Sequence, residues 1–423
     1  MKRCGVVASG LPNASDGGGS IALYGVILEL LELGIEVHVC TLHSGAVSEK
    51  MERQRTALEK LGAKVTFLAL PPPRNSREKM MPAILATETV AQWVRQLSPQ
   101  GILAYSYEGV FATEQVTGLP IFALLADPYH LVRWNAWWYS CYKNNVMTNL
   151  KEGISSLVYH VLINRQLKRG LKKTAHRGAI AAHHAQWYGR FDGRGCRYYC
   201  GRLEDTAGPR WQELRAAQRR GLKKYKLIHV GNTGGTTNRP GIIDFVQTIL
   251  PRLEEKLGTD RSEIHFLGHA ENAEPCLKAV CTKKKNIILR GQVSPIDDEF
   301  LSADLMFVPN PITLGNRTRI ISSWSFGCPV VSHTANIWGI PQLRHDDNVL
   351  LSRNGHEMAE QIVSVLSQPK LAARLSLNGR RDFEAYFDLK AAGATIAQDM
   401  ALLIEGGEPK VAKSEGVCNV KSA

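Results

Sequence analysis

Short apolar runs alternate with amphipathic stretches through the first half of the chain. Buried strands are predicted at Cys4–Ser9, Val37–Leu42, Val65–Leu70, Ile102–Tyr105 and Ile121–Ala126, with a further strand at 178–182. Helical periodicity occupies residues 20–33, 47–62 and 82–97, between the early runs. Strands that alternate with helices in this way are typical of βαβ units around a parallel sheet.

A polar, arginine-rich segment at 202–224 separates this series from a second one. The predicted strands of the second series lie near 226–230, 263–267, 286–289, 304–308, 328–332 and 348–351, and a long amphipathic pattern follows at about 355–404. The whole pattern predicts an α/β protein with two Rossmann-like domains in tandem. The polar composition from Gly406 onward predicts a disordered tail over 406–423.

Composition narrows the class of protein further. The 423 residues suffice for two separate cores. No run of about 18 apolar residues is present, which predicts no membrane-spanning helix, and a strand directly after Arg3 leaves no room for an export signal. Nine scattered cysteines without C-x2-C spacing favour reduced thiols in a cytoplasmic protein. The net charge of +13 favours an anionic partner, such as nucleic acid, an acidic membrane surface or a phosphorylated substrate.

Two glycine-rich turns follow predicted strands and precede predicted helices. The first is Asp16–Ser20, which contains Gly18 and Gly19. The second is Gly231–Gly241, which contains four glycines, several hydroxyls and an arginine. Glycines in this position let a ligand approach the backbone, and a helix N-terminus attracts anions. The second turn suits a diphosphate, whereas the first is equally compatible with a flexible turn.

Two arginines stand at the start of a predicted helix. Arg317 and Arg319 flank Thr318, and no carboxylate occurs from Gly315 to Val331. Cations are unfavourable at a helix N-terminus unless an anion binds there. A bound phosphate makes the arrangement favourable. The alternative is that both side chains reach solvent or a distant acid.

These motifs together resemble the GT-B glycosyltransferases, in particular the GT4-like group that uses nucleotide sugars. The resemblance covers most of residues 1–405. It rests on Gly18-Gly19 followed by LELGIEVHV at 31–39, the turn from Val230 to Gly241, FLGH at 266–269, RGQV at 290–293 with DDEFLSADLMFVPNP after it, and Gly315–Val331. The last segment matches a G-x-R-x-K-x-x-E version of the family signature in its first part and in the G-x-P-V-V at its end.

The resemblance implies a GT-B fold, with two Rossmann-like domains that face each other across a cleft and a C-terminal helix that returns to the N-terminal domain. We expect an acceptor-binding domain at 1–205 with an insertion at about 131–177. A nucleotide-sugar-binding domain at 206–385 and a crossover helix at 386–405 complete the expected organisation. The implied activity is transfer of a sugar from a nucleotide-diphosphate sugar to an acceptor hydroxyl, by a hexosyltransferase-type enzyme without a cofactor.

The same resemblance assigns the donor site. The expected donor-binding residues are Gly18, Gly19, Gly231, Asn232, Arg239, Gly291, Val293, Arg317, Thr318, Arg319 and Ser322. Ser322 stands where relatives carry a glutamate that holds the donor ribose, and Leu314 stands in place of a second glutamate. A serine hydroxyl offers a weaker acceptor than a carboxylate. This substitution leaves open a degenerate protein that binds a nucleotide or a partner without catalysis.

The catalytic side is assigned to polar residues that follow predicted strands. Asp127 and His130 come after the strand at 121–126, and either can orient or deprotonate an acceptor hydroxyl. A capping Asp and a surface His are the alternative. Further acceptor-binding candidates are Glu108, Tyr129 and His183, the last within the pair His183-His184. No D-x-D motif occurs, so we expect a metal-independent reaction in which glycine turns and arginines neutralise charge.

A basic and aromatic segment predicts a partner. Residues 133–139, RWNAWWY, precede an amphipathic stretch at 151–177 with seven Lys and Arg and one acid. Trp and Tyr favour a membrane interface, and Lys and Arg favour anionic headgroups. We therefore expect peripheral binding at the inner face of a membrane, with a lipid-linked or envelope glycan as the acceptor. Ordinary helix packing, or a transferase that acts on modified nucleic acid, are the alternatives.

Overall fold

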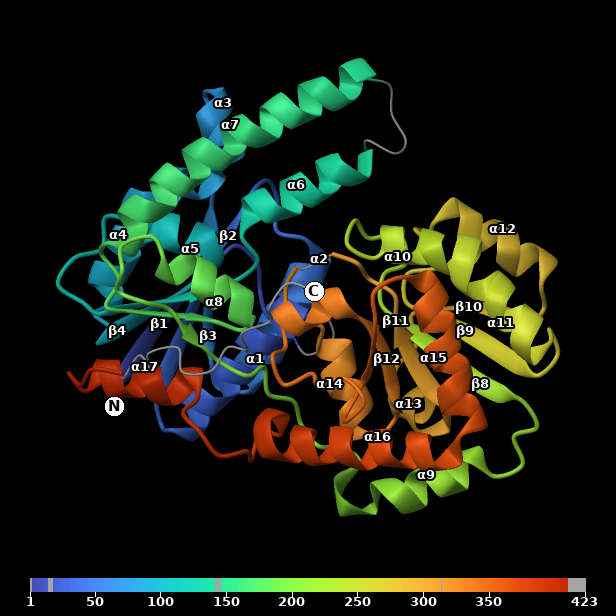
Figure 1. Ribbon diagram of the computed structural model, residues 1–423. Coiled ribbons are helices and arrows are strands. Elements are labelled where there is room, and N and C mark those ends of the chain that lie inside the picture. The colour runs from blue at the N-terminus through green and yellow to red at the C-terminus, as the bar shows by residue number, and fades with distance from the viewer. Residues whose placement is uncertain (1, 14–17, 141–145, 313, 410–423) are drawn as a thin grey trace. The chain divides into compact units, whose positions relative to one another are not determined.

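The computed structural model describes residues 2–13, 18–140, 146–312 and 314–409. Contacts divide the chain into two compact units, and Figure 1 shows their elements. Unit 1 contains Met1–Trp137, Asn144–Cys200 and Gly393–Ala423, and unit 2 contains Trp138–Lys143 and Gly201–Ala392. Each unit has its own parallel sheet with helices on it, so the expected α/β architecture of two Rossmann-like domains is confirmed. The tail expected at 406–423 lies largely outside the described residues.

Unit 1 is built on a seven-stranded sheet in the order β3-β2-β1-β4-β5-β6-β7, with every neighbouring pair parallel. Its strands are β1 (Arg3–Ala8), β2 (Glu36–His43), β3 (Lys64–Ala69), β4 (Gly101–Tyr105), β5 (Ile121–Leu125), β6 (His176–Ala179) and β7 (Arg197–Tyr198). The strand expected at 178–182 is β6, which begins and ends earlier. Residue 182 already belongs to a helix, because Ala181 is its extended N-cap.

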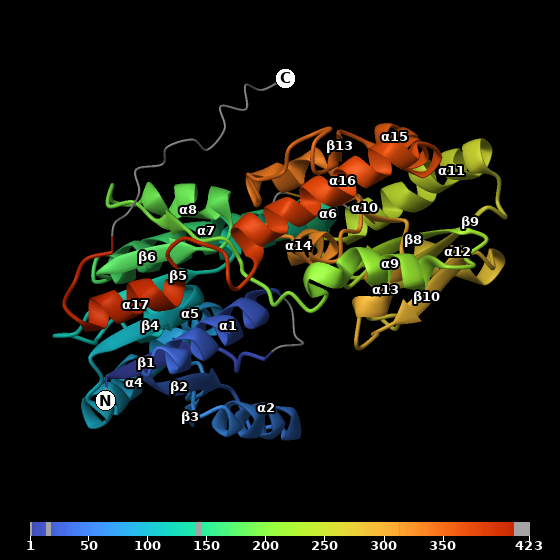
Figure 2. The same cartoon turned by 90° about the horizontal axis from the view of Figure 1, so that it is seen from below.

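The helices of unit 1 cover both faces of this sheet. They are α1 (Gly18–Glu32), α2 (Glu49–Lys60), α3 (Ser76–Met80), α4 (Thr87–Leu97), α5 (Ser106–Ala112), α6 (Tyr129–Ser140), α7 (Val146–Leu171), α8 (Ala182–Gly189) and α17 (Ile396–Ile404), with a 3₁₀ turn at Pro82–Ala86. One core joins α1 and α17 to the sheet, and the other joins α4, α5, α7 and α8. Helix α17 contacts α1 and β4, so the expected return of the C-terminal helix is confirmed (Figure 2).

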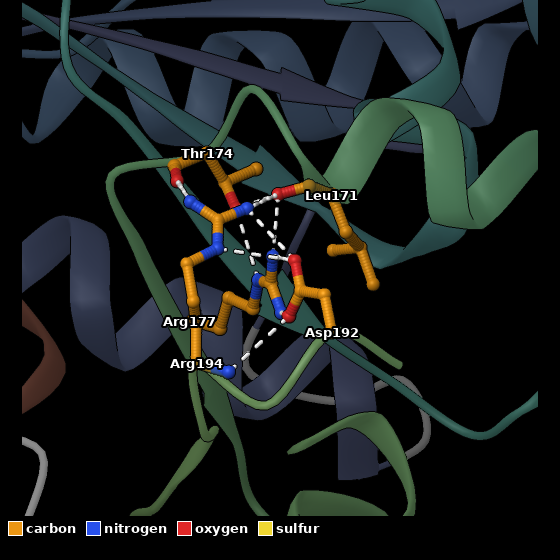
Figure 3. A network of polar contacts seen from close by, with 5 residues as sticks. All are labelled: Leu171, Thr174, Arg177, Asp192 and Arg194. Carbon is orange, nitrogen blue, oxygen red and sulfur yellow. Dashed lines mark hydrogen bonds and ion pairs between the residues drawn. The ribbon is translucent and has the colours of Figure 1, made fainter. Parts of the chain in front are cut away.

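A buried ion pair holds the C-terminal end of α7 to strand β6 of the unit 1 sheet (Figure 3). Both terminal guanidinium nitrogens of Arg177, Nη1 and Nη2, donate to the Asp192 carboxylate at 2.6 Å. Arg177 and Arg194 also donate to the Leu171 carbonyl at 2.6 Å, and Arg177 Nε donates to Thr174 Oγ1 at 3.1 Å. Because the last carbonyls of a helix lack partners within it, the two arginines complete the end of α7.

Unit 2 is built on a six-stranded parallel sheet in the order β10-β9-β8-β11-β12-β13. Its strands are β8 (Tyr225–Val230), β9 (Ser262–Leu267), β10 (Ile287–Gly291), β11 (Leu305–Val308), β12 (Val330–His333) and β13 (Leu350–Ser352). Its α-helices are α9 (Trp211–Arg219), α10 (Arg239–Asp244), α11 (Leu250–Leu257), α12 (Pro275–Lys283), α13 (Asp297–Ser302), α14 (Thr318–Ser325), α15 (Gly355–Ser367) and α16 (Pro369–Asp382), with 3₁₀ turns at Gly208–Arg210 and Thr334–Trp338 and π-helical turns at Phe245–Ile249 and Phe383–Phe387.

The long amphipathic pattern at 355–404 contains the three α-helices α15, α16 and α17. Pro369 begins α16 because proline lacks an N–H and fits only the first turn of a helix. The chain then leaves the helical conformation at Asp388, and Thr395 caps α17 with a reciprocal capping box. The apolar residues of α15 and α16 remain in unit 2, and those of α17 join unit 1.

Candidate functional site

The two arginines of the sequence motif lie at the start of α14, but the structure gives them different surroundings. Arg317 is the N-cap residue and is buried. Its Nε donates to Asn336 Oδ1 at 3.0 Å, and its Nη2 donates to the Ile312 carbonyl at 2.8 Å. Arg317 thus fastens the loop before α14 to the 3₁₀ turn at Thr334–Trp338.

Arg319, the second residue of the same helix, points its guanidinium at the glycine turn after β8. Its Nη1 lies 3.4 Å from His229 Nε2, and its Nη2 donates to Asn238 Oδ1 at 3.1 Å. Both partners are neutral, and no described carboxylate lies within ion-pair distance of Arg319. Burial, with the charge of Arg317 nearby, lowers the pKa of Arg319 from 12.5 to about 9. A partly buried cation without a counterion is a site that an anion stabilises.

His229 orients the Arg319 guanidinium from the middle of the unit 2 core. Its Nδ1 lies 3.2 Å from the Phe307 carbonyl, which accepts only, so the ring proton resides on Nδ1. The lone pair of Nε2 then faces Arg319. Burial and the Arg319 charge lower the pKa of His229 to about 3, so the ring is neutral at pH 7.

The glycine turn itself is shaped around this cation. Gly231 has φ +134°, and a Cβ there would lie 2.9 Å from the Arg319 guanidinium. A Cβ at Gly234 would lie 1.5 Å from the Asn272 carbonyl. Asn238, which accepts from Arg319, also holds the turn through a 2.7 Å hydrogen bond from its Nδ2 to the Asn232 carbonyl. Only glycine permits this backbone path, which presents the turn to a ligand next to Arg319.

The remaining donor-site candidates of unit 2 are placed as follows. Gly291 ends β10 with φ +72°, and its carbonyl accepts from Gly268 N at 2.8 Å, so it lies at the same sheet edge as Gly231. Val293 follows it and is partly exposed. Thr318 begins α14, and Ser322 lies one turn after Arg319 with a partly exposed side chain.

Arg239 has a carboxylate partner that the sequence did not reveal. Its Nε lies 3.3 Å from Oε2 of Glu274, a residue that is only 2% exposed. The charge of Arg239 at the start of α10 is therefore largely balanced within the protein. Arg319 differs from Arg239 in this respect, because no described carboxylate lies within ion-pair distance of it.

In unit 1, the polar candidates gather at the carboxyl edge of the sheet. Asp127 follows β5, and its Oδ1 lies 3.6 Å from Nδ1 of His184 on α8. The Asp127 side chain is 46% exposed, whereas His184 is buried. The His183 ring lies 4.0 Å from that of His184. The Tyr188 hydroxyl donates to the carbonyl of Ala126 at 2.9 Å and so fixes the turn that carries Asp127.

Tyr105 links this edge to the first glycine turn. A Cβ on Gly19 would lie only 2.5 Å from the Tyr105 hydroxyl oxygen. The absence of a side chain at Gly19 therefore leaves space for this hydroxyl near the start of α1. Burial, with the charges of Asp127 and Glu108 nearby, raises the pKa of Tyr105 and keeps the hydroxyl neutral at pH 7. Gly18 begins α1. Tyr129 and His130 begin α6, and their side chains lie outside the described part of the chain.

A cavity of about 560 Å³ opens at the carboxyl ends of β1, β2 and β4 within unit 1. Apolar walls and a few polar groups form it, among them Leu11, Leu42, Met81, Phe111, His43 and Glu108. Glu108 accepts a hydrogen bond from the hydroxyl of Ser106. This cavity suits a ligand that carries hydroxyls on an apolar frame.

Comparison with known proteins finds a family similarity within unit 2. Residues 224–368 match the family model of the glycosyl transferases group 1. This segment is therefore similar to that family. The whole chain also has the GT-B fold, as the sequence resemblance predicted. No curated protein sequence matches the chain.

Solved GT-B structures align over nearly the full length. Sucrose-phosphate synthase from Thermosynechococcus elongatus aligns with a TM-score of 0.68 at 13% identity, over 96% of this chain and 99% of that one. HepE from Anabaena, in complex with UDP-glucose, aligns with a TM-score of 0.64 at 15% identity, over 96% and 100%. A glycosyltransferase from Rickettsia africae gives 0.61 at 12% identity, over 96% of each chain. At such identity the likeness concerns the fold.

Within this GT-B chain, sequence reasoning missed two residues of interest. His229 lies inside a buried strand, where a histidine among apolar residues is the available signal. His43 lines the unit 1 cavity and ends β2, and a polar residue directly after an apolar run is the signal there. No group of three or more His, Cys, Asp or Glu side chains in the described residues is arranged to hold a metal.

Proposed function

We propose that this protein transfers a sugar from a nucleoside-diphosphate sugar to a hydroxyl of an acceptor. The observation that carries the proposal is Arg319, a partly buried cation that lacks a carboxylate partner among the described residues and is held by His229 against a glycine turn. A diphosphate placed at that turn supplies the missing negative charge. Because HepE has been solved with UDP and with UDP-glucose, UDP-sugars are the first donors to test.

The chemical step transfers the glycosyl group, and the bonds that form and break are those of its anomeric carbon. The acceptor oxygen attacks this carbon, the bond to the β-phosphate oxygen breaks, and the nucleoside diphosphate leaves with the extra negative charge. Arg319 and the amides of the turn stabilise that charge as it develops, which is the kind of interaction that accelerates such a reaction most. Asp127, oriented by His184, takes the acceptor proton.

We further propose that the unit 1 cavity accepts the acceptor and that the reaction needs no metal. The cavity combines apolar walls with Glu108 and His43, which suits a glycan hydroxyl on a lipid-linked or envelope acceptor. Arg319 supplies the positive charge that a divalent cation would otherwise provide. Excess EDTA should then leave turnover unchanged, and a loss that Mg²⁺ or Mn²⁺ restores would contradict the metal-independent mechanism.

The test is a donor panel of UDP-, GDP- and dTDP-sugars, with hydrolysis and transfer both monitored and nucleotide binding measured by calorimetry. One nucleotide series is expected to bind and to turn over. Arg319→Met should abolish most of this binding, and Arg353→Met, a change at an arginine whose side chain is 77% exposed, is the matched control. Absence of both nucleotide binding and turnover across the panel would refute the proposal.

A further inference from the structure

The outer face of α7 exposes large apolar side chains without a partner in the described structure. Met147, Leu150, Ile154, Leu157, Val158 and Val161, here called the apolar strip, are between 44% and 74% exposed. Their spacing of three and four residues places them on one side of the helix. A contiguous exposed apolar strip of this kind marks an interaction site in a folded protein.

Cationic residues continue the same side of α7 toward its C-terminal end. Arg165 follows Val161 by four residues, and Lys168, Arg169 and Lys172 follow at helical spacing, all exposed. None of these four has an ion pair within the described residues. Glu152 is the one acid in the sequence from Val146 to Lys173. We call the apolar strip and these four cations together the α7 surface.

Glu152 does not offset this charge, because it is engaged elsewhere. It lies 3.4 Å from an Arg133 nitrogen of α6, on another side of α7. The α7 surface is therefore apolar along its first turns and purely cationic along its last turns. Figure 1 shows the first half of α7 extending beside α6, with its second half on the unit 1 core.

Helix α7 is already folded before binding, so little conformational entropy is lost when the α7 surface binds a partner. Trp137 of α6 donates through Nε1 to the Asn149 carbonyl at 2.7 Å and packs against Gly153, where a Cβ would lie 2.9 Å from it. The second half is buried through Ile163 and Leu167, and the Arg177–Asp192 pair completes its end. Neither anchor uses a residue of the α7 surface.

We propose that the α7 surface docks the protein onto an anionic lipid bilayer, with the apolar strip at the boundary of headgroups and acyl chains. The four cations then meet lipid phosphates, and the exposed Trp134 of α6 lies near the interface that tryptophan favours. A second copy of the chain is a poorer occupant, because it would bring two sets of like charges together on chains of net charge +13. Nucleic acid is also a poorer occupant, because its binding depends on contacts between cations and phosphates and would leave the apolar strip exposed.

This binding is interfacial. None of the described helices is both long and apolar enough to cross a bilayer. The proposal goes beyond the proposed sugar transfer, and the vesicle experiment below contains no nucleotide sugar. A failure to bind vesicles and a failure to transfer sugar are therefore separate results.

The test is flotation of the full-length protein with vesicles of phosphatidylcholine alone or with about one third phosphatidylglycerol. We expect recovery with the anionic vesicles to exceed recovery with the neutral ones and to fall as salt rises. Changing Arg165, Lys168 and Lys172 to Gln should weaken binding about fivefold per cation, or roughly 100-fold together. The matched control changes Lys60, Lys283 and Lys285 to Gln, three exposed cations outside α7.

A second pair of variants tests the apolar strip. Leu150→Asp with Leu157→Asp should weaken anionic-vesicle binding by about tenfold or more, because the strip can no longer enter the interface. Leu33→Asp with Leu377→Asp, two leucines of similar exposure outside α7, should bind as the unchanged protein does. Thermal unfolding of each variant reports whether it is folded.

Three results would overturn the proposal. The first is a folded protein that ignores anionic vesicles. The second is binding that the cation and leucine variants leave intact. The third is a concentration-dependent dimer, seen in sedimentation velocity and broken by the Leu150 and Leu157 changes without any vesicle binding, which would show that a second copy covers the strip.

Discussion

Replacing Arg319 by Met tests the contribution of its charge to nucleotide binding apart from the contribution of its side-chain packing. Met retains an apolar side chain of moderate length and removes every donor. If a diphosphate balances Arg319, affinity for UDP should fall by about 1.5–3 kcal/mol, or about 10- to 150-fold, the range for hydrogen bonds to charged groups. The described residues offer no other unpaired guanidinium at the glycine turn, since Arg317 binds Asn336 and Arg239 pairs with Glu274.

The empty protein should respond in the opposite direction. Because burial lowers the pKa of Arg319 to about 9, the folded state holds the charged form at a cost at neutral pH. The cost is fully present below that pKa and declines as the pH rises through it toward the ordinary value. Arg319→Met removes the cost, so the unliganded variant should be at least as stable as the parent protein. A buried residue lost for purely structural reasons would lower stability instead.

The assay combines calorimetry with UDP and thermal unfolding with and without UDP, from about pH 7 to about pH 10. In the parent protein, UDP affinity should decline above about pH 9 as Arg319 loses its proton. The variant should lack this decline, and Arg353→Met should behave as the parent does. Unchanged UDP affinity in Arg319→Met, or a loss of unliganded stability as large as the loss of binding, would refute the reasoning.

Three further predictions concern the turn, the acid–base pair and the unit 1 ion pair. Gly231→Ala should weaken UDP binding about tenfold or more, because a Cβ 2.9 Å from the Arg319 guanidinium displaces it, and intact calorimetric affinity would show that the turn can adjust. Asp127→Asn should lower kcat by about 100-fold or more in the transfer assay while UDP affinity stays the same; a loss of both would make Asp127 structural. Arg177 holds the pKa of Asp192 well below its ordinary value, so the stability from this pair is present above about pH 4 and lost as the pH falls further. Asp192→Asn should therefore lower the free energy of unfolding, measured in urea, by about 3–5 kcal/mol at pH 7. The difference in this free energy between variant and parent should become smaller as the pH falls below about 4. A difference that does not change with pH would show that the pair carries no charge.

The strands and most helices could be predicted from the sequence because buried parallel strands are short apolar runs. The runs at Val37–Leu42 and Ile121–Ala126 correspond to β2 and β5. Strand β7 has two residues and no apolar run, so nothing local marks it. The division of residues 355–404 into separate helices is marked in the sequence by Pro369. The packing of α17 on unit 1 depends on contacts with α1 and β4, which are distant in the sequence.

The candidate site was less predictable, for a physical reason. The glycines at 231–235 and the arginines at 317 and 319 can be recognised as candidates from the sequence alone. Their different roles depend on partners far along the chain, since Arg317 meets Asn336 and Arg319 meets His229. Periodicity carries no information about such pairings. The same limit applies to Arg239 and Glu274, which lie 35 positions apart and form a pair only in the folded unit.

The return of α17 to unit 1 has a consequence for how the chain is made. The residues of unit 2 from Gly201 to Ala392 form one continuous segment, whereas unit 1 is assembled from both sides of it. During synthesis the sheet of unit 2 is complete before α17 exists. Unit 1 lacks until then the side chains of Met400 and Leu403 in its core and the carboxylate of Asp399 that Arg197 and Tyr199 bind. The domain that begins first is thus the one that finishes last.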